Sequence, residues 1–292
     1  MNKVLITGKT QLLGVIGYPV EHSLSPVMHN AAIAELGLDY IYLPLPIQPK
    51  NLEVAIAGLA AMEVVGFSVT IPHKQAIMPL LSEISPIAKV IGAVNTVSRQ
   101  NQGWLGTNTD IEGFIAPLQT TYQQDWSRKT ALILGYGGAA RAVVAGCEQL
   151  GLAQIHVVGR NMDKLAEFRK SWGNSPLAGK LQIHLWDDLA KLIPQANLLV
   201  NTTPVGMYPH VNQSPVSQED LQNLLPGAIA YDLIYIPQPT QFLQQAQKQG
   251  AIVIDGLEML LQQGVAALKI WLQRDTVPVD VMRQAVQNYL IR

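Results

Sequence analysis

The sequence predicts an α/β protein of two domains with mainly parallel sheets. Short apolar runs alternate with longer segments of helical periodicity, which is the pattern of repeated βαβ units. The chain has 292 residues, which suits two domains at roughly 150 residues each. Because 48% of the residues are hydrophobic and 14% are charged, the chain can bury a large core and is not disordered.

In the first third, the predicted strands are apolar runs that end near glycine or proline, with helices between them. The first helix is marked at both ends. Ser25 is the predicted N-cap, Pro26 fits the first helical position, and Gly37 ends the helix. The predicted strands are 12–16, 40–45 and 65–70, and the predicted helices are 26–36 and 51–62.

A second alternation of strands and helices begins near 126–129. Its first strand, 131–134, leads through a glycine-rich turn into a helix over 138–150, which is typical of a dinucleotide-binding Rossmann fold. The remaining predicted strands are 155–158, 198–201, 229–233 and 252–254, and the remaining helices are 162–171, 257–272 and 278–291.

Charge and cysteine content exclude several classes of function. Twenty Lys and Arg residues nearly balance 21 Asp and Glu, so no broad nucleic-acid surface is expected. The single cysteine, Cys147, excludes a disulfide framework, and its apolar neighbours predict a buried thiol. The longest uncharged stretch, 192–218, is broken by prolines, and the start does not resemble a signal peptide. We therefore expect no membrane association and a cytoplasmic location, or an organelle after removal of a transit peptide.

The glycine-rich turn at 135–141 indicates a dinucleotide site. Its residues match G-x-G-x-x-A, with a predicted strand before it and a predicted helix after it. Gly135 allows the tight turn, Gly137 allows close approach of a pyrophosphate, and the N–H groups of the helix attract its charge. We therefore expect a bound nucleotide rather than a ligand-free glycine turn.

The end of the next predicted strand distinguishes NAD from NADP. An NAD site usually has a carboxylate here, and a carboxylate would repel a 2′-phosphate. This chain has Gly159, Arg160 and Asn161 instead, and an arginine fork can hold a phosphate through two hydrogen bonds. Lys164, one helical turn later, adds a positive charge. The alternative is a solvated turn arginine; we expect NADP.

Polar side chains in the first third exceed what folding alone requires. Ser25 could serve only as an N-cap, but Ser23 has no such structural explanation. Lys74 is predicted at a helix N-terminus, where the helix dipole disfavours a cation, so it points to a function. The whole set suits a small polyhydroxylated ligand and consists of Ser23, Ser25, Thr70, Lys74, Asn95 and Asp110.

The six histidines form no recognisable metal motif. None pairs with another at i, i+4 spacing beside a carboxylate, so no metal site is expected. His22, His29 and His73 lie close to the polar residues in sequence. We expect each of them to pack or to cap a helix rather than to contact a ligand.

Six motifs, in a fixed order, extend over most of the chain. They are G-x-P-x-x-H-S-L-S-P-x-M-H-N (17–30), V-T-x-P-x-K (69–74), G-A-V-N-T (92–96), N-T-D-x-x-G-F (108–114), G-x-G-G-A-A-R (135–141) and D-G-L-x-M-L-x-x-Q (255–263). Through them the chain resembles the shikimate dehydrogenase family from Gly14 to about Leu272. The resemblance implies NADPH-dependent reduction of 3-dehydroshikimate to shikimate, in the pathway to chorismate and the aromatic amino acids.

The resemblance also implies roles for individual residues. Lys74 matches the catalytic lysine of the family, and Asp110 matches the carboxylate beside it. The substrate-binding positions that it implies are Ser23, Ser25, Thr70, Lys74, Asn95, Asp110, Tyr235 and Gln263. The cofactor-binding positions that it implies are Gly135, Tyr136, Gly137, Gly138, Ala139, Gly159, Arg160, Asn161, Lys164, Thr202, Leu233 and Gly256, with 201–207 on the nicotinamide side.

The motifs suggest a discontinuous division of the chain. We expect a substrate-binding and catalytic domain formed by 1–111 and 258–292, and an NADP-binding Rossmann domain formed by 112–257. The chain departs from the family pattern in two places. Gly159 stands where asparagine is commoner, which could weaken an adenine or ribose contact, and the first ten residues have no counterpart in shorter members.

Two alternatives remain open at this point. One is a quinate/shikimate dehydrogenase with relaxed substrate choice or NAD use. The other is a non-catalytic NADPH-binding regulatory module, although Lys74 and Asp110 are both present. In either case the expected partners are small molecules, with no nucleic acid or membrane, and the protein is expected to be a monomer or a homodimer.

Overall fold

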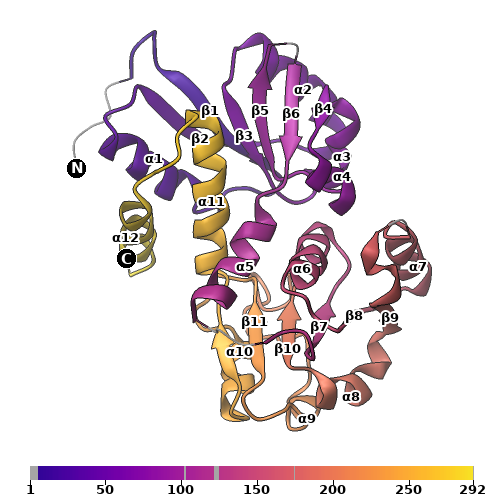
Figure 1. Cartoon of the computed structure of the whole chain (residues 1–292). Helices are drawn as coiled ribbons and strands as arrows, with labels where there is room; N and C mark the ends of the chain where they lie inside the picture. Colours follow the sequence, from indigo (N-terminus) through magenta and orange to yellow (C-terminus); the bar gives the residue numbers. More distant parts are fainter. Residues whose placement is uncertain (1–5, 102, 122–124, 174, 292) are drawn as a thin grey trace. The chain divides into compact units, whose positions relative to one another are not determined.

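The computed structural model describes residues 6–101, 103–121, 125–173 and 175–291, which form two compact α/β units (Figure 1). The first unit comprises Met1–Thr109 and Leu261–Arg292, and the second comprises Asp110–Leu260. The domain limits expected from the sequence lie a few residues from these breaks. The assignment of substrate binding to one domain and NADP binding to the other stays a prediction.

The first ten residues are only partly described. Residues 1–5 lie outside the described residues, and Thr10 Oγ1 donates a hydrogen bond to Asp39 at 2.6 Å.

The first unit is built on a six-stranded mixed sheet with the order β2-β1-β3-β5-β6-β4. Strands β2, β1 and β3 are parallel, β5 is antiparallel to both β3 and β6, and β4 is parallel to β6. The three strands predicted from the sequence are confirmed, and the β5–β6 hairpin is new. The strands are β1 (Gln11–Gly17), β2 (Tyr40–Pro46), β3 (Gly66–Val69), β4 (Glu83–Ile84), β5 (Thr96–Gln100) and β6 (Gly103–Thr107).

Two glycines let helices approach closely in the first unit. A Cβ at Gly264 of α11 would overlap Met28 of α1, and a Cβ at Gly66 of β3 would overlap the Trp271 ring. Helix α1 also packs on α12 (Figure 1). The helices are α1 (Ser25–Glu35), α2 (Leu52–Ala61), α3 (His73–Ala76), α4 (Pro86–Ile91), α11 (Leu257–Leu272), which begins in the second unit, and α12 (Val279–Leu290).

The second unit has a fully parallel six-stranded sheet with the order β9-β8-β7-β10-β11-β12. This is the strand order of a Rossmann fold, whose topological switch point lies between the first and fourth strands, here β7 and β10. The Rossmann expectation is therefore confirmed. The strands are β7 (Thr130–Leu134), β8 (Gln154–Gly159), β9 (Leu181–Leu185), β10 (Leu198–Asn201), β11 (Ile229–Asp232) and β12 (Ile252–Ile254).

The second unit buries its helices against this sheet. Gly146 of α6 lies against the Phe114 ring of α5, which stacks on Tyr231 with ring centroids 5.3 Å apart. Cys147 is fully buried, as expected. The helices are α5 (Asp110–Thr121), α6 (Gly138–Gln149), α7 (Met162–Lys170), α8 (Leu189–Leu192), α9 (Gln218–Leu221) and α10 (Gln241–Lys248).

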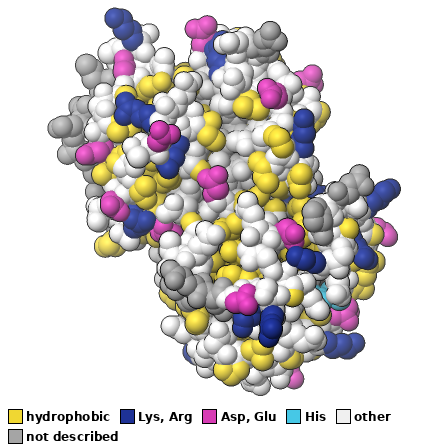
Figure 2. Space-filling model, in the orientation of Figure 1, with side chains coloured by type: hydrophobic (Ala, Val, Ile, Leu, Met, Phe, Trp, Pro, Cys, Tyr) yellow, Lys and Arg dark blue, Asp and Glu magenta, His cyan; other side chains and the backbone are white. Residues whose placement is uncertain are grey.

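The surface shows mixed charge. In Figure 2, Lys and Arg side chains stand in small separate groups among Asp and Glu, with no single broad basic patch on the face shown. Within the part of the chain that the structure describes, no helix combines the length and the apolar character needed to cross a membrane.

Candidate active site

The polar residues predicted in the first unit gather at one edge of its sheet. The carboxyl ends of β1 and β3 meet there with the start of β5 and the end of β6, because β5 runs antiparallel to its neighbours. Thr70 N–H donates to the Ile16 carbonyl at 2.9 Å, and Val69 N–H donates to the Asn95 carbonyl at 2.7 Å. This edge therefore brings together the segments that carry Ser23, Ser25, Thr70, Lys74 and Asn95.

Ser23 lies in the turn between β1 and α1, and Ser25 begins α1. Ser23 Oγ accepts the Ser25 N–H at 3.3 Å. The expected N-cap at Ser25 is wrong: Leu24 is the N-cap, and Ser25 is the first residue of α1. The helix begins earlier because the Leu24 carbonyl already accepts the Met28 N–H at 3.2 Å. The buried Ser25 side chain instead hydrogen-bonds the Tyr42 hydroxyl.

Lys74 lies in the first turn of the short helix α3, as predicted. Its backbone carbonyl accepts the Val94 N–H at 2.8 Å, and its side chain is half-buried. The neighbouring His73 packs as expected: it is fully buried, and its Nε2 lies 2.7 Å from the Ile47 carbonyl oxygen. The main chain at Lys74 is thus anchored on both sides.

Asn95 connects this edge to the segment just before Asp110. Asn95 is buried, its Oδ1 accepts the Thr109 N–H at 2.8 Å, and its Nδ2 donates to Thr109 Oγ1 at 3.0 Å. Asn108 Nδ2 donates to the Ala93 carbonyl at 3.0 Å. Asp110 is the next residue of the chain and the first of α5, and it is buried. These bonds fix the position at which the chain leaves the first unit.

The remaining predicted substrate residues are distributed between the units. Gln263 is buried and lies on the part of α11 that belongs to the first unit, next to the glycine that packs on α1. Tyr235 follows β11 in the second unit and is half-buried. Because Asp110 and Tyr235 belong to the second unit, their joint action with Lys74 stays a prediction.

The glycine-rich turn of the second unit fits a dinucleotide pyrophosphate. Gly135 has φ +105°, and a Cβ there would lie 2.8 Å from Thr202 Oγ1, so the position requires glycine. A Cβ on Gly137, in contrast, would have nothing within 4 Å. Helix α6 begins at Gly138 with no side-chain cap at Gly137, so its first N–H groups are suited to an anion. The open side of this turn is a cradle that a pyrophosphate would fill.

The end of β8 carries the predicted 2′-phosphate residues. Arg160 and Lys164 have exposed side chains, so both cations can reach an anion. Asn161 also has a structural role, because its Oδ1 caps α7 by accepting the Lys164 N–H at 2.9 Å. Packing explains Gly159, since any side chain there would overlap the Tyr136 ring from the glycine-rich turn.

A buried polar cluster joins the loops that follow β10 and β11. Asp232, which is fully buried, accepts hydrogen bonds from Asn201 Nδ2 at 3.0 Å and the Ile234 N–H at 3.1 Å. Its second oxygen accepts Thr240 Oγ1 at 2.7 Å. Burial raises the pKa of Asp232 to about 6, and these hydrogen bonds oppose the rise. Asn201 Oδ1 in turn accepts the Thr203 N–H at 3.0 Å. We call these residues the Asp232 cluster.

Three predicted cofactor residues lie near the Asp232 cluster. Thr202 Oγ1 donates to the Leu134 carbonyl at 2.6 Å, which ties its loop to the end of β7 beside the glycine-rich turn. Gly256 has no space for a side chain, because a Cβ there would overlap the Leu233 carbonyl. The predicted cofactor residues of the second unit therefore share the carboxyl edge of its sheet.

The set predicted from the sequence omits Tyr42 and Asp232, which hold parts of this site in place. Both are completely buried on strands. For Asp232 the sequence does contain a signal: a carboxylate ends the apolar strand Ile229–Asp232, and a buried carboxylate must find hydrogen-bond donors. For Tyr42 no local signal exists, because its partners come from α1 and β3.

His29 is buried in the first unit, as expected for a packing residue. Its ring stacks on Tyr42 at a centroid distance of 4.3 Å and lies tilted against Trp271 at 5.4 Å. Among the described residues, neither ring nitrogen has a hydrogen-bond partner. Burial lowers the pKa of His29 to about 3. His22, in contrast, is exposed.

We expect His29→Phe to flatten the loss of stability in acid. An unfolded histidine takes up a proton near pH 6.5, whereas folded His29 stays neutral down to about pH 3. The unfolded state therefore binds more protons in this window. As the pH decreases, the free energy of unfolding falls by up to about 1.4 kcal/mol for each pH unit. The effect is confined to the window between about pH 3 and 6.5. When the free energy of unfolding is measured by urea at several pH values between about 4.5 and 6, it should depend less steeply on pH for the variant than for the wild type. Equal slopes in the two proteins would contradict this account of His29.

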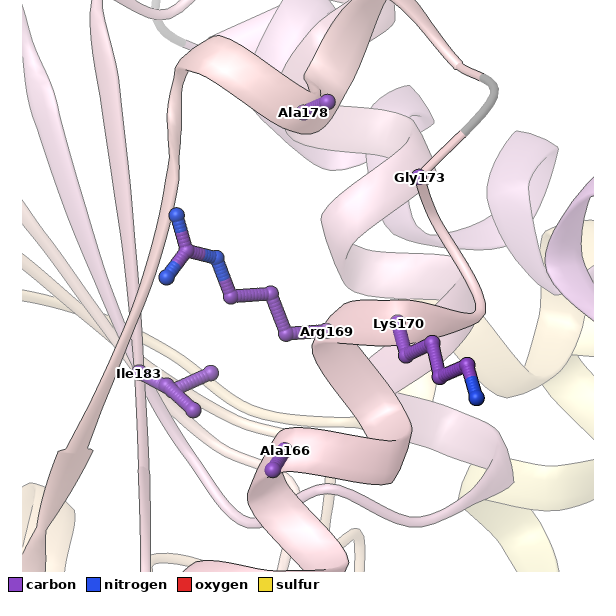
Figure 3. A pocket seen from close by; sticks show the side chains of 6 residues that line it. All are labelled: Ala166, Arg169, Lys170, Gly173, Ala178 and Ile183. Atoms are coloured by element: carbon purple, nitrogen blue, oxygen red, sulfur yellow. The ribbon is translucent and has the colours of Figure 1, made fainter.

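The cavity in Figure 3 lies apart from these residues. It measures about 390 Å³ and lies between the second half of α7 and β9. Arg169 points toward the strand that carries Ile183, whereas Lys170 points away. None of the predicted site residues lines it; its lining is Ala166, Arg169, Lys170, Gly173, Ala178 and Ile183. Among the described residues, no group of three or more His, Cys, Asp or Glu side chains is placed to hold a metal ion.

Comparisons with known proteins agree with this architecture. The profile of the shikimate dehydrogenase substrate binding domain matches residues 15–97, and that of the shikimate 5'-dehydrogenase C-terminal domain matches 256–287. The shikimate dehydrogenase (NADP(+)) of Trichormus variabilis is 77% identical, covering 98% of this chain and 99% of the relative. The protein of the same name from Synechocystis is 61% identical and covers 98% of both chains.

A solved structure extends the likeness to the fold. The shikimate dehydrogenase of Thermus thermophilus, in complex with NADP(H) and shikimate, superposes with a TM-score of 0.83 at 32% identity, over 95% of this chain and 99% of that one. Its sequence is far more distant than those of the two curated relatives, yet the fold agrees over almost the whole length. With identity of 77% to a relative that it covers almost completely, this chain belongs to the shikimate dehydrogenase family.

Proposed function

We propose that this protein catalyses the reversible reduction of 3-dehydroshikimate to shikimate with NADPH, and that Lys74 is its general acid and base. The observation that carries the proposal is the position of Lys74 at the sheet edge that also bears Ser23, Ser25 and Asn95. The glycine-rich turn and the exposed Arg160 of the second unit support NADP as the cofactor.

The chemistry requires a proton donor at the ketone. When bound, NADPH would supply the hydride. The ketone oxygen gains negative charge as the hydride is transferred to the carbonyl carbon. The Lys74 ammonium stabilises that charge and gives the oxygen its proton. In the oxidation direction neutral Lys74 accepts the hydroxyl proton. Asp110 orients the ammonium and hydrogen-bonds the substrate.

The remaining polar residues hold the substrate. We assign the Ser23 and Ser25 hydroxyls to the substrate carboxylate, because Ser25 begins α1 and a helix N-terminus favours an anion. Asn95, Thr70 and Gln263 supply amide and hydroxyl groups for the ring hydroxyls. Tyr235 completes the set from the second unit.

One assay tests the function. Oxidation of shikimate or quinate is measured with NADP or NAD through the absorbance of the reduced nicotinamide. The proposal predicts the highest kcat/KM for shikimate with NADP. Equal rates for quinate and shikimate with NAD would favour the relaxed quinate/shikimate enzyme, and no rate with any pair would favour the regulatory module.

We expect Arg160→Ala to raise the KM for NADP by about 10- to 100-fold, because a charge-assisted hydrogen bond contributes about 1.5–3 kcal/mol. The KM for NAD should stay the same, since NAD has no 2′-phosphate. Arg169→Ala is the matched control, because Arg169 is also exposed but lies at the other end of α7. Equal changes in the KM values for NADP and NAD would show that Arg160 does not bind the phosphate.

Two expectations from the sequence remain predictions. One is the oligomeric state, a monomer or a homodimer, which light scattering after gel filtration distinguishes. The other is the cytoplasmic location.

A further inference from the structure

Tyr42 places its hydroxyl between two serines of the first unit. The residue lies in β2 and is fully buried. Its hydroxyl donates to Ser68 Oγ of β3 at 2.9 Å, and it also hydrogen-bonds Ser25 at the start of α1. Three hydroxyl groups are thus connected in series: Ser68, Tyr42 and Ser25. We call this the hydroxyl chain.

The rest of Tyr42 is fixed on every side. Its backbone N–H donates to Asn30 Oδ1 at 2.9 Å, and its carbonyl accepts Asn30 Nδ2 at 2.9 Å. Its ring stacks on His29 with an interplanar angle of 23° and lies 5.8 Å from the Trp271 ring. Trp271 is itself held by a 2.9 Å hydrogen bond from Nε1 to the Val97 carbonyl. The hydroxyl therefore has little freedom to move away from Ser25.

The hydroxyl chain has a direction that an anion would select. Each hydroxyl has one proton to donate and can accept as well. In the structure Tyr42 donates its proton to Ser68. When Ser25 donates its proton to an anion, this order can reverse, because Ser25 can then accept the proton of Tyr42 and Tyr42 can accept that of Ser68. All three bonds then point the same way, and each polarises the next. Burial raises the pKa of Tyr42 far above its usual value, so its hydroxyl keeps its proton.

We propose that Tyr42 is a positioning residue that orients and polarises Ser25 toward the substrate carboxylate. This inference rests on the proposed function, in which Ser25 contacts that carboxylate. The sequence motifs give Tyr42 no such role. Tyr42 acts through Ser25. It favours a substrate that presents a charged hydrogen-bond acceptor to the Ser25 hydroxyl.

The test compares Tyr42→Phe with the wild type on shikimate and on its methyl ester. Phenylalanine keeps the ring packing and removes only the hydroxyl. We expect the KM for shikimate to rise by about 5- to 10-fold with kcat nearly unchanged, in line with one lost hydrogen bond to a group that serves an anion. The KM for the methyl ester should change by less than about twofold, because its neutral ester is a weaker acceptor.

Two further variants control the result. Ser68→Ala removes the far end of the hydroxyl chain and should raise the KM for shikimate by about two- to threefold, again with little effect on the ester. It also replaces the first variant if Tyr42→Phe fails to fold. Tyr40→Phe, on the same strand and only half-buried, should leave both KM values unchanged.

The outcomes separate this inference from the proposed function. A rise in KM for shikimate alone supports the role of Tyr42. Equal rises for the acid and the ester, or no rise for either, would overturn it while leaving the dehydrogenase activity intact. A wild-type protein that does not oxidise shikimate would instead contradict the proposed function.

Discussion

Lys74→Ala is expected to lower kcat by about two to four orders of magnitude, the usual contribution of a positioned general acid or base. Hydride transfer leaves charge on the substrate oxygen, and alanine can neither stabilise that charge nor donate a proton. The serines and amides that hold the substrate are unchanged, so the KM for shikimate should rise by less than about tenfold. Steady-state kinetics in both directions measures the two constants.

Two other lysine variants distinguish loss of charge from loss of proton transfer. Lys74→Arg keeps a cation but cannot release a proton at neutral pH, so it should remain well below the wild-type kcat. Lys89→Ala is the matched control, because Lys89 is an exposed lysine of α4 in the same unit. Near-normal turnover by Lys74→Ala would assign the proton transfer to another group.

Most of the parallel strands, but not β4 and β9, could be predicted from the sequence, because each of them is a short apolar run along the chain. Strands buried on both faces read as continuous apolar runs, and β10, which is buried along its length, was predicted at its observed limits. The edge strand β12 is partly exposed, but it is also a continuous apolar run and was predicted at its observed limits. The β5–β6 hairpin has no such pattern, since β5 ends in exposed Arg99 and Gln100. Its turn depends instead on Gly103, where φ is +136° and where a Cβ would overlap Ser82. That requirement is a tertiary contact, which local periodicity does not contain.

The candidate site likewise contains residues that could be predicted from the sequence and residues that could not. The glycine-rich turn, Arg160 and Lys74 are conspicuous because each breaks or fulfils a rule of the element in which it lies. Tyr42 looks like an ordinary strand residue until α1 and β3 are packed against it. The Ser25 N-cap was wrong for a related reason. Serine is a good N-cap by propensity, but Leu24 occupies the N-cap position of α1. The Ser25 hydroxyl forms a hydrogen bond with Tyr42 instead of capping the helix.

Asp232→Ala is expected to lower the free energy of unfolding by about 3 kcal/mol or more, because it leaves several buried donors without their acceptor. These donors are Asn201 Nδ2, the Ile234 N–H and Thr240 Oγ1. The loops after β10 and β11 carry Thr202 and Leu233, so the KM for NADP should rise as well. Urea unfolding and cofactor kinetics measure the two effects. An unchanged unfolding free energy would show that the Asp232 cluster is not a stabilising contact.

Asp232→Asn keeps the shape of the side chain but removes its charge, so it tests how ionisation of Asp232 affects stability. The folded pKa of about 6 lies above the ordinary 3.8, so the native state holds the proton more tightly than the unfolded state. The resulting stability is fully present below pH 3.8 and is lost as the pH rises through about 6. Asparagine cannot titrate, so the stability of the wild type relative to this variant should fall by up to about 1.4 kcal/mol per pH unit across that window. His29 has the opposite slope but is present in both proteins, so it cancels from the comparison. A difference that rises with pH would mean that the hydrogen bonds outweigh burial. Near neutral pH the ionised carboxylate therefore stabilises the fold less than the protonated form does, but it still fixes the loops that carry the proposed cofactor residues.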